Sequence, residues 1–288
     1  MKKLIISAAL SGTATSKEMA PTVPYTAKEI AEQTVAVVKA GASIVHIHVR
    51  ESNGMPTMET DYFVRAFESI KKATQDAGVD VILNFTTSGS PRIETNALRL
   101  AHLRKLRPEI CSFDAGTMNW NYSGVFVNAP DFLEELSACV VENDIKPEIE
   151  IFDGGMIGNA LYYIKKYNIP DPNHFQFVLG VGGGLDGTVR NLSFLRDMLP
   201  EGSTWSVSGI GRAHLPMLLA GLAMGADGIR VGLEDNIYMS RGVIATNLSL
   251  VERAVEFAKL AGREPASASE ARNMLGIKRR ALDLDRIG

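Results

Sequence analysis

Eight short apolar runs recur along the chain, and a longer stretch with polar residues on one face follows each of them. The runs cover residues 3–10, 43–50, 80–87, 109–116, 147–153, 175–181, 204–211 and 228–235. Their length and their β-branched residues predict buried strands. The stretches between them predict helices over 26–40, 60–77, 95–106, 130–143, 156–167, 189–199, 213–224 and 242–261, with a last helix over 267–275. A strand–helix unit repeated in this way indicates an α/β fold, a parallel eight-stranded (β/α)8 TIM barrel, with an open doubly wound sheet as the alternative.

The chain has 288 residues, which is close to the roughly 250 residues of a typical barrel of this kind. No stretch rich in Pro, Gly and Ser divides it. We therefore expect one (β/α)8 barrel domain over residues 1–288, with a C-terminal helical extension from about residue 262. The charged tail over residues 276–288 is expected outside the barrel proper, at a subunit contact.

The charge balance argues for neither of two classes of partner. A formal net charge of −3 and a pI of about 6.0 favour neither nucleic acid nor a membrane surface. No apolar run approaches the roughly 20 residues that a membrane span needs. The first residues, "MKKLIISAALSGTA", imitate a short secretory signal, but the same run is equally typical of a first strand. Cys111 and Cys139 form no metal-ligand or CxxC pair, which is typical of a reducing cytoplasm.

Polar residues gather at the ends of the predicted strands. In a (β/α)8 barrel the active site lies at the C-terminal ends of the strands, where several strands each contribute a side chain. The second strand ends with His46, His48 and Arg50, and the last strand ends in the segment "RVGLEDN". The strands between them contribute Asn84, Thr86, Thr87, Ser112, Asp114, Glu148, Glu150, Asp153 and the segment "SVSGIGR". This distribution predicts a polar site at one end of the barrel.

His46 and His48 stand two residues apart, so both imidazoles face the same side of their strand. Such a pair favours metal binding, whereas a lone inward histidine is usually a hydrogen-bonded core residue. A catalytic zinc site takes three protein ligands and keeps one open position. Glu234 or Asp235 of "RVGLEDN" is placed to supply the third ligand. The alternative is that this segment only begins a loop and caps a helix.

Glycines also collect after two strands, in "GVGGG" at 180–184 and "SGIGR" at 208–212. Barrel loops of this kind often bind phosphate through backbone N–H groups and a helix N-terminus. The pattern is compatible with a phosphorylated substrate or a CoA diphosphate, and equally with a plain tight turn.

The motifs taken together resemble one family. The segments "AGASIVHIHVRE", "FDAGTMNW", "PEIEIFDGGM", "FQFVLGVGGG", "SGIGR" and "RVGLEDN" occur in this order, and the whole is similar to the β-keto acid cleavage enzymes from Leu4 to about Leu275. The resemblance implies a zinc-dependent (β/α)8 barrel that assembles as a homotetramer. It also implies the reaction, in which a β-keto acid and acetyl-CoA give acetoacetate and a new acyl-CoA.

The resemblance assigns roles to five residues. It implies zinc ligands at His46, His48 and Glu234, a general base at Asp235, and an essential arginine at Arg230. Zinc as a Lewis acid can acidify the carbon between a carboxylate and a ketone, which makes a carboxylate base sufficient. The arginine is expected to stabilise anionic oxygen and to orient the base.

Substrate-binding positions follow from the same resemblance. They fall on Thr86, Ser112 and Glu150, and ordinary hydrogen bonding inside the barrel is the alternative for all three. In family members that act on 3-keto-5-aminohexanoate, a glutamate in the loop after the first strand binds the substrate amino group, and Ala14 stands at that position here. A methyl group cannot balance a buried ammonium, so we expect a neutral or mildly polar β-keto acid instead. Asp114 complicates this expectation, because a cationic substrate becomes compatible if Asp114 faces the substrate tail.

Two other functions remain alternatives at this point. One is a metal-dependent aldolase or lyase that needs no CoA, since such barrels also bind divalent metals through histidines and carboxylates. The other is a barrel that binds a ligand without catalysis. The presence of Arg230, Glu234 and Asp235 together argues against the second alternative.

Overall fold

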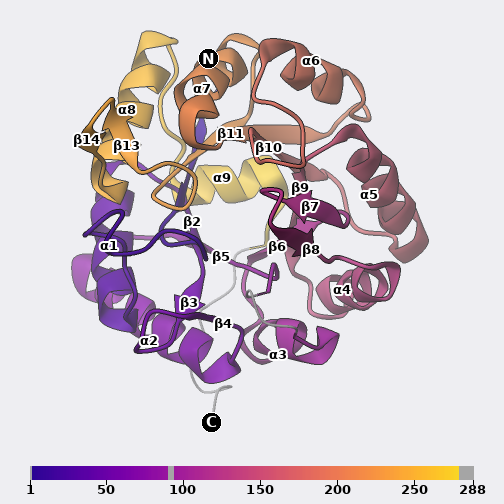
Figure 1. Cartoon of the computed structure of the whole chain (residues 1–288), viewed down its shortest axis with the longest axis horizontal. Helices are drawn as coiled ribbons and strands as arrows, with labels where there is room; N and C mark the ends of the chain where they lie inside the picture. Colours follow the sequence, from indigo (N-terminus) through magenta and orange to yellow (C-terminus); the bar gives the residue numbers. More distant parts are fainter. Residues whose placement is uncertain (1, 90–93, 279–288) are drawn as a thin grey trace.

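The computed structural model describes residues 2–89 and 94–278. Eight parallel strands close into a barrel in the order β1-β12-β11-β10-β9-β6-β5-β2 (Figure 1). The barrel strands are β1 (Ile5–Ala9), β2 (Ile44–Ile47), β5 (Ile82–Phe85), β6 (Ile110–Asp114), β9 (Lys146–Ile151), β10 (His174–Leu179), β11 (Thr204–Gly209) and β12 (Gly228–Val231). Because β1 pairs with β2 on one side and with β12 on the other, this sheet has no free edge. The predicted barrel is confirmed, and the doubly wound sheet is excluded.

A ring of helices surrounds the strands (Figure 1). They are α1 (Ala27–Ala40), α2 (Thr60–Ala77), α3 (Asn96–Leu106), α4 (Pro130–Glu142), α5 (Gly154–Tyr167), α6 (Val189–Asp197), α7 (His214–Ala223) and α8 (Asn247–Leu260), with a short 3-10 helix η1 (Gly211–Ala213) before α7. Helix α1 illustrates how the sequence sets the bounds. Thr26 and Glu29 form a capping box at its start, and Gly41 ends it. No helix of the described residues is both long and apolar enough to cross a bilayer.

Three small hairpins follow barrel strands at the C-terminal end, and the sequence patterns did not predict them. They are β3 (Val49–Arg50) with β4 (Pro56–Thr57), β7 (Met118–Trp120) with β8 (Gly124–Phe126), and β13 (Tyr238–Ser240) with β14 (Val243–Ile244). The predicted helix over 242–261 is therefore wrong at its start. Helix α8 begins at Asn247, where the hydroxyl of Thr246 accepts a hydrogen bond from the Ser249 N–H.

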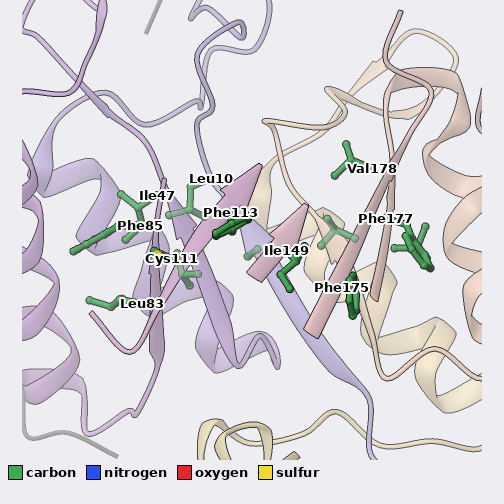
Figure 2. Close-up of a cluster of buried hydrophobic side chains, with 14 of the residues drawn as sticks. Leu10, Ile47, Leu83, Phe85, Cys111, Phe113, Ile149, Phe175, Phe177 and Val178 are labelled. Atoms are coloured by element: carbon green, nitrogen blue, oxygen red, sulfur yellow. The ribbon is translucent and has the colours of Figure 1, made fainter. Parts of the chain in front are cut away.

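Side chains alternate between the two faces of the barrel wall. Outward residues are apolar and pack under the helices: the ring of Phe85 lies 5.6 Å from that of Phe63 and 6.3 Å from that of Phe67, both on α2. Figure 2 shows this outer apolar layer, including Leu83 and Phe85 on β5. Inward residues in the middle of the barrel are polar, and they include His46, Asn84, Ser112, Glu148, Gln176, Ser206 and Arg230. A barrel interior is usually filled by branched apolar residues, so these inward polar residues indicate where a functional site lies.

The last helix, α9 (Ala268–Leu275), closes the N-terminal end of the barrel. Its apolar residues Ala268, Ala271 and Leu275 form one cluster with the isoleucines that open β1, β2, β5 and β6. The isoleucines are Ile5, Ile44, Ile82 and Ile110. In Figure 1 the helix crosses the middle of the ring. The end of the barrel opposite the polar site is thus sealed by apolar contacts. The charged tail expected at a subunit contact lies outside the described residues from residue 279 onward.

Candidate active site

The two histidines of strand β2 meet a glutamate from the far end of the sequence. His46 is the inward residue of β2, and His48 lies just beyond the strand. Both are buried, and their rings lie 5.1 Å apart in an edge-to-face arrangement. Oε1 of Glu234 lies 3.7 Å from Nε2 of His46 and 3.4 Å from Nε2 of His48. The structure therefore brings all three predicted metal ligands together.

Glu234 reaches this position through a sharp turn after β12. Gly232 has a φ of +145°, and a Cβ at this residue would lie 2.0 Å from the carbonyl oxygen of Ala9. Only glycine therefore allows the chain to turn so close to β1. The backbone N–H groups of Asp235 and Asn236 both donate to the Gly232 carbonyl, which fixes the turn. As expected for neighbours at a strand end, Glu234 faces the histidines and Asp235 faces another partner.

The donor atoms of this set fit a zinc ion. Zinc bonds of about 2.0–2.1 Å place neighbouring ligand atoms about 3.3 Å apart in a tetrahedral site. The two measured nitrogen-to-oxygen distances are 3.4 and 3.7 Å, and the second carboxylate oxygen of Glu234 is buried without a hydrogen-bond partner in the described residues. Two imidazoles with one carboxylate also match a known catalytic zinc ligand set.

The protonation states of the set suit metal binding as well. Burial lowers the pKa of His46 to about 3, with Glu234 opposing the shift and Arg230 adding to it, so the imidazole is neutral near pH 7. Burial raises the pKa of Glu234, but the nearby Arg230 above all, together with the two histidines, outweighs burial and holds that pKa well below its usual range. A neutral imidazole and an ionised carboxylate are the forms that bind a metal ion.

A second group of donors shares His46 and adds Glu148 and Glu150 from β9. Both glutamates already accept hydrogen bonds, Glu148 from Asn84 at 2.6 Å and Glu150 from Arg230 at 3.2 Å. Burial raises the pKa of Glu148 to about 7 and that of Glu150 well above its usual range, which disfavours the ionised forms. The set of His46, His48 and Glu234 is therefore the better metal site.

Arg230 is the fixed cation at the centre of the polar interior. Its Nε and Nη2 donate to the two oxygens of Asp235 at 3.0 and 2.9 Å, a bidentate pair. Nη2 also donates to Glu234 at 2.6 Å, and Nη1 donates to Glu150 at 3.2 Å. Burial lowers the pKa of Arg230, but Asp235, Glu234 and Glu150 outweigh it and raise that pKa well above its usual value. One guanidinium thus links the candidate base, the candidate metal ligand and Glu150.

Comparison with known proteins identifies the family of this chain. A sequence profile of the β-keto acid cleavage enzyme family matches residues 3–277. The chain belongs to this family. It is 41% identical over 280 residues to the 3-keto-5-aminohexanoate cleavage enzyme of Fusobacterium nucleatum, with 97% of this chain and 100% of the relative covered. It is 34% identical over 284 residues to the 3-oxoadipate:acetyl-CoA acetyltransferase of Cupriavidus necator, with 97% of this chain and 96% of that one covered.

A solved structure shares the fold of this β-keto acid cleavage enzyme. The binary complex of ObcA with oxaloacetate superposes with a TM-score of 0.74 and 23% identity, over 90% of this chain and 68% of that chain. At this level of identity the likeness shows the barrel fold alone. The resemblance read from the motifs is thereby confirmed for the family and for the architecture.

The predicted hydroxyls of this family member are already engaged within the protein. Thr86 accepts a hydrogen bond from the Ser88 N–H at 3.1 Å, and Ser112 accepts one from the Thr87 N–H at 2.9 Å. The hydroxyl of Thr87 in turn donates to the Ser112 carbonyl at 3.0 Å. These bonds tie the segment after β5 to β6. They support ordinary interior bonding, and a substrate contact of Thr86 or Ser112 stays a prediction.

Asp114 and Ala14 occupy different surroundings. Asp114 is buried and stands in register with Glu150. Its Oδ2 accepts a hydrogen bond from the Ser88 hydroxyl at 2.9 Å. Its Oδ1 has no hydrogen-bond partner within the described part of the chain. Burial raises the pKa of Asp114, with Ser88 and Arg99 opposing the shift. Ala14 is exposed in the loop after β1. Of the two positions, only Asp114 offers a polar atom toward the inside of the barrel.

Arg50 follows His48 at the end of the second predicted strand, and the sequence assigns it no role. Its Nη2 donates to the carbonyls of Ser11, Gly12 and Thr15 at 3.2, 2.7 and 2.9 Å. The guanidinium therefore holds the loop that carries Ala14 beside the two histidines. The spacing alone was the available signal, because the carbonyls it binds lie more than 30 residues away in sequence.

The glycine-rich segment after β10 packs against the β7–β8 hairpin. A Cβ at Gly183 would lie 2.0 Å from the carbonyl oxygen of Asn119, and Gly182 accepts from the Asn121 N–H at 2.8 Å. This close approach supports the interpretation as a tight turn, and phosphate binding there stays a prediction. The remaining histidines, His102, His174 and His214, are buried outside the metal-capable groups of the described residues.

Proposed function

We propose that this enzyme combines a β-keto acid with acetyl-CoA and releases acetoacetate and a new acyl-CoA. The observation that carries the proposal is the direct contact between the three-donor group and the arginine–aspartate pair: Nη2 of Arg230 donates both to Glu234 at 2.6 Å and to Asp235 at 2.9 Å. The candidate metal ligand Glu234 and the candidate base Asp235 thus share one hydrogen-bond network, which supports the proposal. Membership in the family and the acetyl-CoA transferase names of several relatives support the choice of co-substrate.

Zinc held by His46, His48 and Glu234 would supply a Lewis acid for the oxygens of the keto acid. Asp235 takes a proton from the carbon between the carboxylate and the ketone. Both of its oxygens are hydrogen-bonded to Arg230, so its direction is fixed before substrate arrives. Arg230 also faces the negative charge that develops on the substrate, and its own pairing keeps it charged.

The remaining steps balance without another reactant. The substrate carbanion attacks the acetyl carbonyl of acetyl-CoA, a carbon–carbon bond forms, and the CoA thiolate leaves. The thiolate then attacks the original ketone carbon, and the bond between that carbon and the former carbanion carbon breaks. The products are the new acyl-CoA and the carbanion of acetoacetate, which regains the proton from Asp235.

Acetoacetate formed from a panel of β-keto acids, with and without acetyl-CoA, tests the proposal. We expect product only when both substrates are present. Turnover of a keto acid without acetyl-CoA would establish the aldolase or lyase alternative. Absence of bound zinc by mass spectrometry, together with absence of turnover, would establish a barrel that only binds a ligand.

The substrate tail is proposed to be neutral or mildly polar. Ala14 offers no charge to an ammonium group, and the half-satisfied carboxyl of Asp114 offers one hydrogen-bond acceptor. Within the panel, a 3-keto acid with a hydroxyl or alkyl tail should exceed 3-keto-5-aminohexanoate in kcat/KM. The variant Ala14→Glu should raise kcat/KM for the amino substrate selectively. A wild-type preference for the amino substrate that Asp114→Asn removes would overturn the Ala14 argument and assign the cation to Asp114.

We further propose that the protein is cytoplasmic, forms one barrel domain and assembles as a homotetramer. Cys111 and Cys139 are both free and buried, as a reducing compartment permits. The assembly rests on the family resemblance, and light scattering of the purified protein measures it directly.

A further inference from the structure

Two buried polar residues beside His46 have no part in the chemistry described above. Asn84 is the inward residue of β5 in register with His46, and Glu148 is the inward residue of β9. Both are fully buried, and Nδ2 of Asn84 donates to Oε2 of Glu148 at 2.6 Å. The bond spans the inside of the barrel, because β6 lies between β5 and β9. A short, buried hydrogen bond of this kind holds both side chains in place.

The same region contains two buried atoms that lack hydrogen bonds. Within the residues that the structure describes, neither Oδ1 of Asn84 nor Nδ1 of His46 has a partner. An amide oxygen accepts and a protonated ring nitrogen donates, so the two atoms are complementary. The residues that carry them are cross-strand neighbours, because His46 of β2 stands in register with Asn84 of β5. Unpaired buried polar atoms are uncommon in folded proteins and call for a partner.

The bond to Glu148 decides which way the Asn84 amide faces. Oε2 of Glu148 accepts from Nδ2 of Asn84, so the carboxyl of Glu148 holds the NH2 group of Asn84 toward itself. The amide oxygen of Asn84 then has to face the other way. An amide oxygen that accepts from the ring of His46 would favour the tautomer with a proton on Nδ1, which leaves the lone pair on Nε2. Nε2 is the atom that lies 3.7 Å from Glu234.

We propose that Asn84, held by Glu148, is a positioning residue that sets the tautomer and ring orientation of His46 for zinc. The inference rests on the proposed function, since it requires zinc at His46. Metal-binding histidines commonly donate their second ring N–H to a protein acceptor, and loss of such an acceptor weakens metal binding by about 10–100-fold. Asn84 supplies that acceptor, and Glu148 prevents the amide from turning over.

Zinc affinity of the metal-free protein, measured by competition with a chromogenic chelator, tests the proposal independently of turnover. Asn84→Leu removes the acceptor and should raise the zinc dissociation constant about 10–100-fold. Asn84→Asp keeps an acceptor for the ring N–H and should stay close to wild type. Histidine-selective ¹⁵N spectra should show His46 of the wild type protonated on Nδ1, and a mixture of tautomers in Asn84→Leu.

Gln176→Leu is the matched control. Gln176 is an equally buried amide on β10, hydrogen-bonded to Ser206 and not to His46, so its loss perturbs the polar interior without touching the proposed contact. An unchanged dissociation constant in Asn84→Leu, or an equal loss in Gln176→Leu and Asn84→Leu, overturns the inference. A wild-type protein that binds no zinc overturns the proposed function instead, so the two failures are distinguishable.

Discussion

Two buried arginines hold opposite ends of the same barrel, and they differ in what surrounds them. Arg272 on α9 donates to Glu109 at 2.7 and 2.9 Å and to Asp80 at 2.6 and 3.0 Å. One guanidinium therefore pairs with two carboxylates at the N-terminal end of the strands. Arg230 at the other end contacts three carboxylates, and unpaired buried atoms of Glu234 and Asp114 lie in the same interior.

The difference separates a stabilising charge network from a functional one. At the N-terminal end, the charges of Arg272, Glu109 and Asp80 are paired with each other beside the apolar cluster of α9. At the C-terminal end, one carboxylate oxygen each of Glu234 and Asp114 is buried without a hydrogen-bond partner in the described residues, which is costly unless a ligand supplies one. In (β/α)8 barrels the C-terminal end generally carries chemistry and the N-terminal end carries stability. Substitutions at the two ends should therefore affect different measurements.

The largest effect is expected at the catalytic end. Asp235→Asn keeps the shape of the side chain but removes the proposed base, so kcat should fall by about 10²–10⁴-fold. Zinc content should stay at the wild-type level, because Glu234 and not Asp235 faces the histidines. Turnover and zinc stoichiometry are measured on the same preparation. Undiminished turnover would remove Asp235 from the mechanism.

At the N-terminal end, Arg272→Met should reduce stability and leave catalysis in place. The substitution leaves Glu109 buried without its cation, and breaking a buried pair costs about 3–5 kcal/mol of unfolding free energy. Urea unfolding measures this cost, and kcat measured well below the unfolding temperature should match wild type. Arg196→Met, which breaks an exposed pair with Asp197, is the control and should change stability by less than about 1 kcal/mol. A large fall in kcat for folded Arg272→Met would show that the two ends are coupled.

The sequence predicted one end of the barrel better than the other. The eight strands follow from apolar runs, and the candidate ligands His46 and His48 follow from the alternation of side chains along β2. The hairpins escaped prediction because each strand has only two or three residues and its pairing depends on packing over the barrel end. Helix α9 was predicted as a helix, but its amphipathic pattern does not say which surface it covers. Asn84 was noted as polar, yet its role depends on Glu148, 64 residues away in sequence.

The apolar contacts by which α9 closes the barrel can be tested separately from the charge pairs of Arg272. Leu275 is fully buried against the isoleucines at the start of the strands, so Leu275→Ala should cost about 2–5 kcal/mol of unfolding free energy through lost burial and a residual cavity. Leu260→Ala at the end of α8 is the control, since this side chain is 86% exposed and its loss should change stability by less than about 0.5 kcal/mol. Equal stability of the two variants would mean that α9 does not seal the barrel.

The smallest effect is expected for Glu29, a charged residue at the catalytic end of the barrel that caps helix α1 and has no part in the proposed chemistry. Glu29 accepts hydrogen bonds from the backbone N–H groups of Thr26 and Tyr25 and pairs with Lys17. Burial raises its pKa, but these contacts outweigh burial and lower the pKa from 4.5 to about 2. Because the folded pKa is the lower one, the stabilisation is complete above pH 4.5 and is lost as the pH falls toward 2. Solvent screening at this partly exposed site keeps it below about 1 kcal/mol.

The stability difference between wild type and Glu29→Gln should therefore be largest near pH 6 and shrink steadily between pH 4.5 and 2. Urea midpoints at several pH values measure it, and kcat of the variant near neutral pH should match wild type. Glu134→Gln, which loses an exposed pair with Lys166, is the control for the loss of a surface carboxylate. A stability difference that grows as the pH falls would mean that folding raises the pKa of Glu29 instead of lowering it. It would also remove the evidence that charges near the active end can act on stability alone.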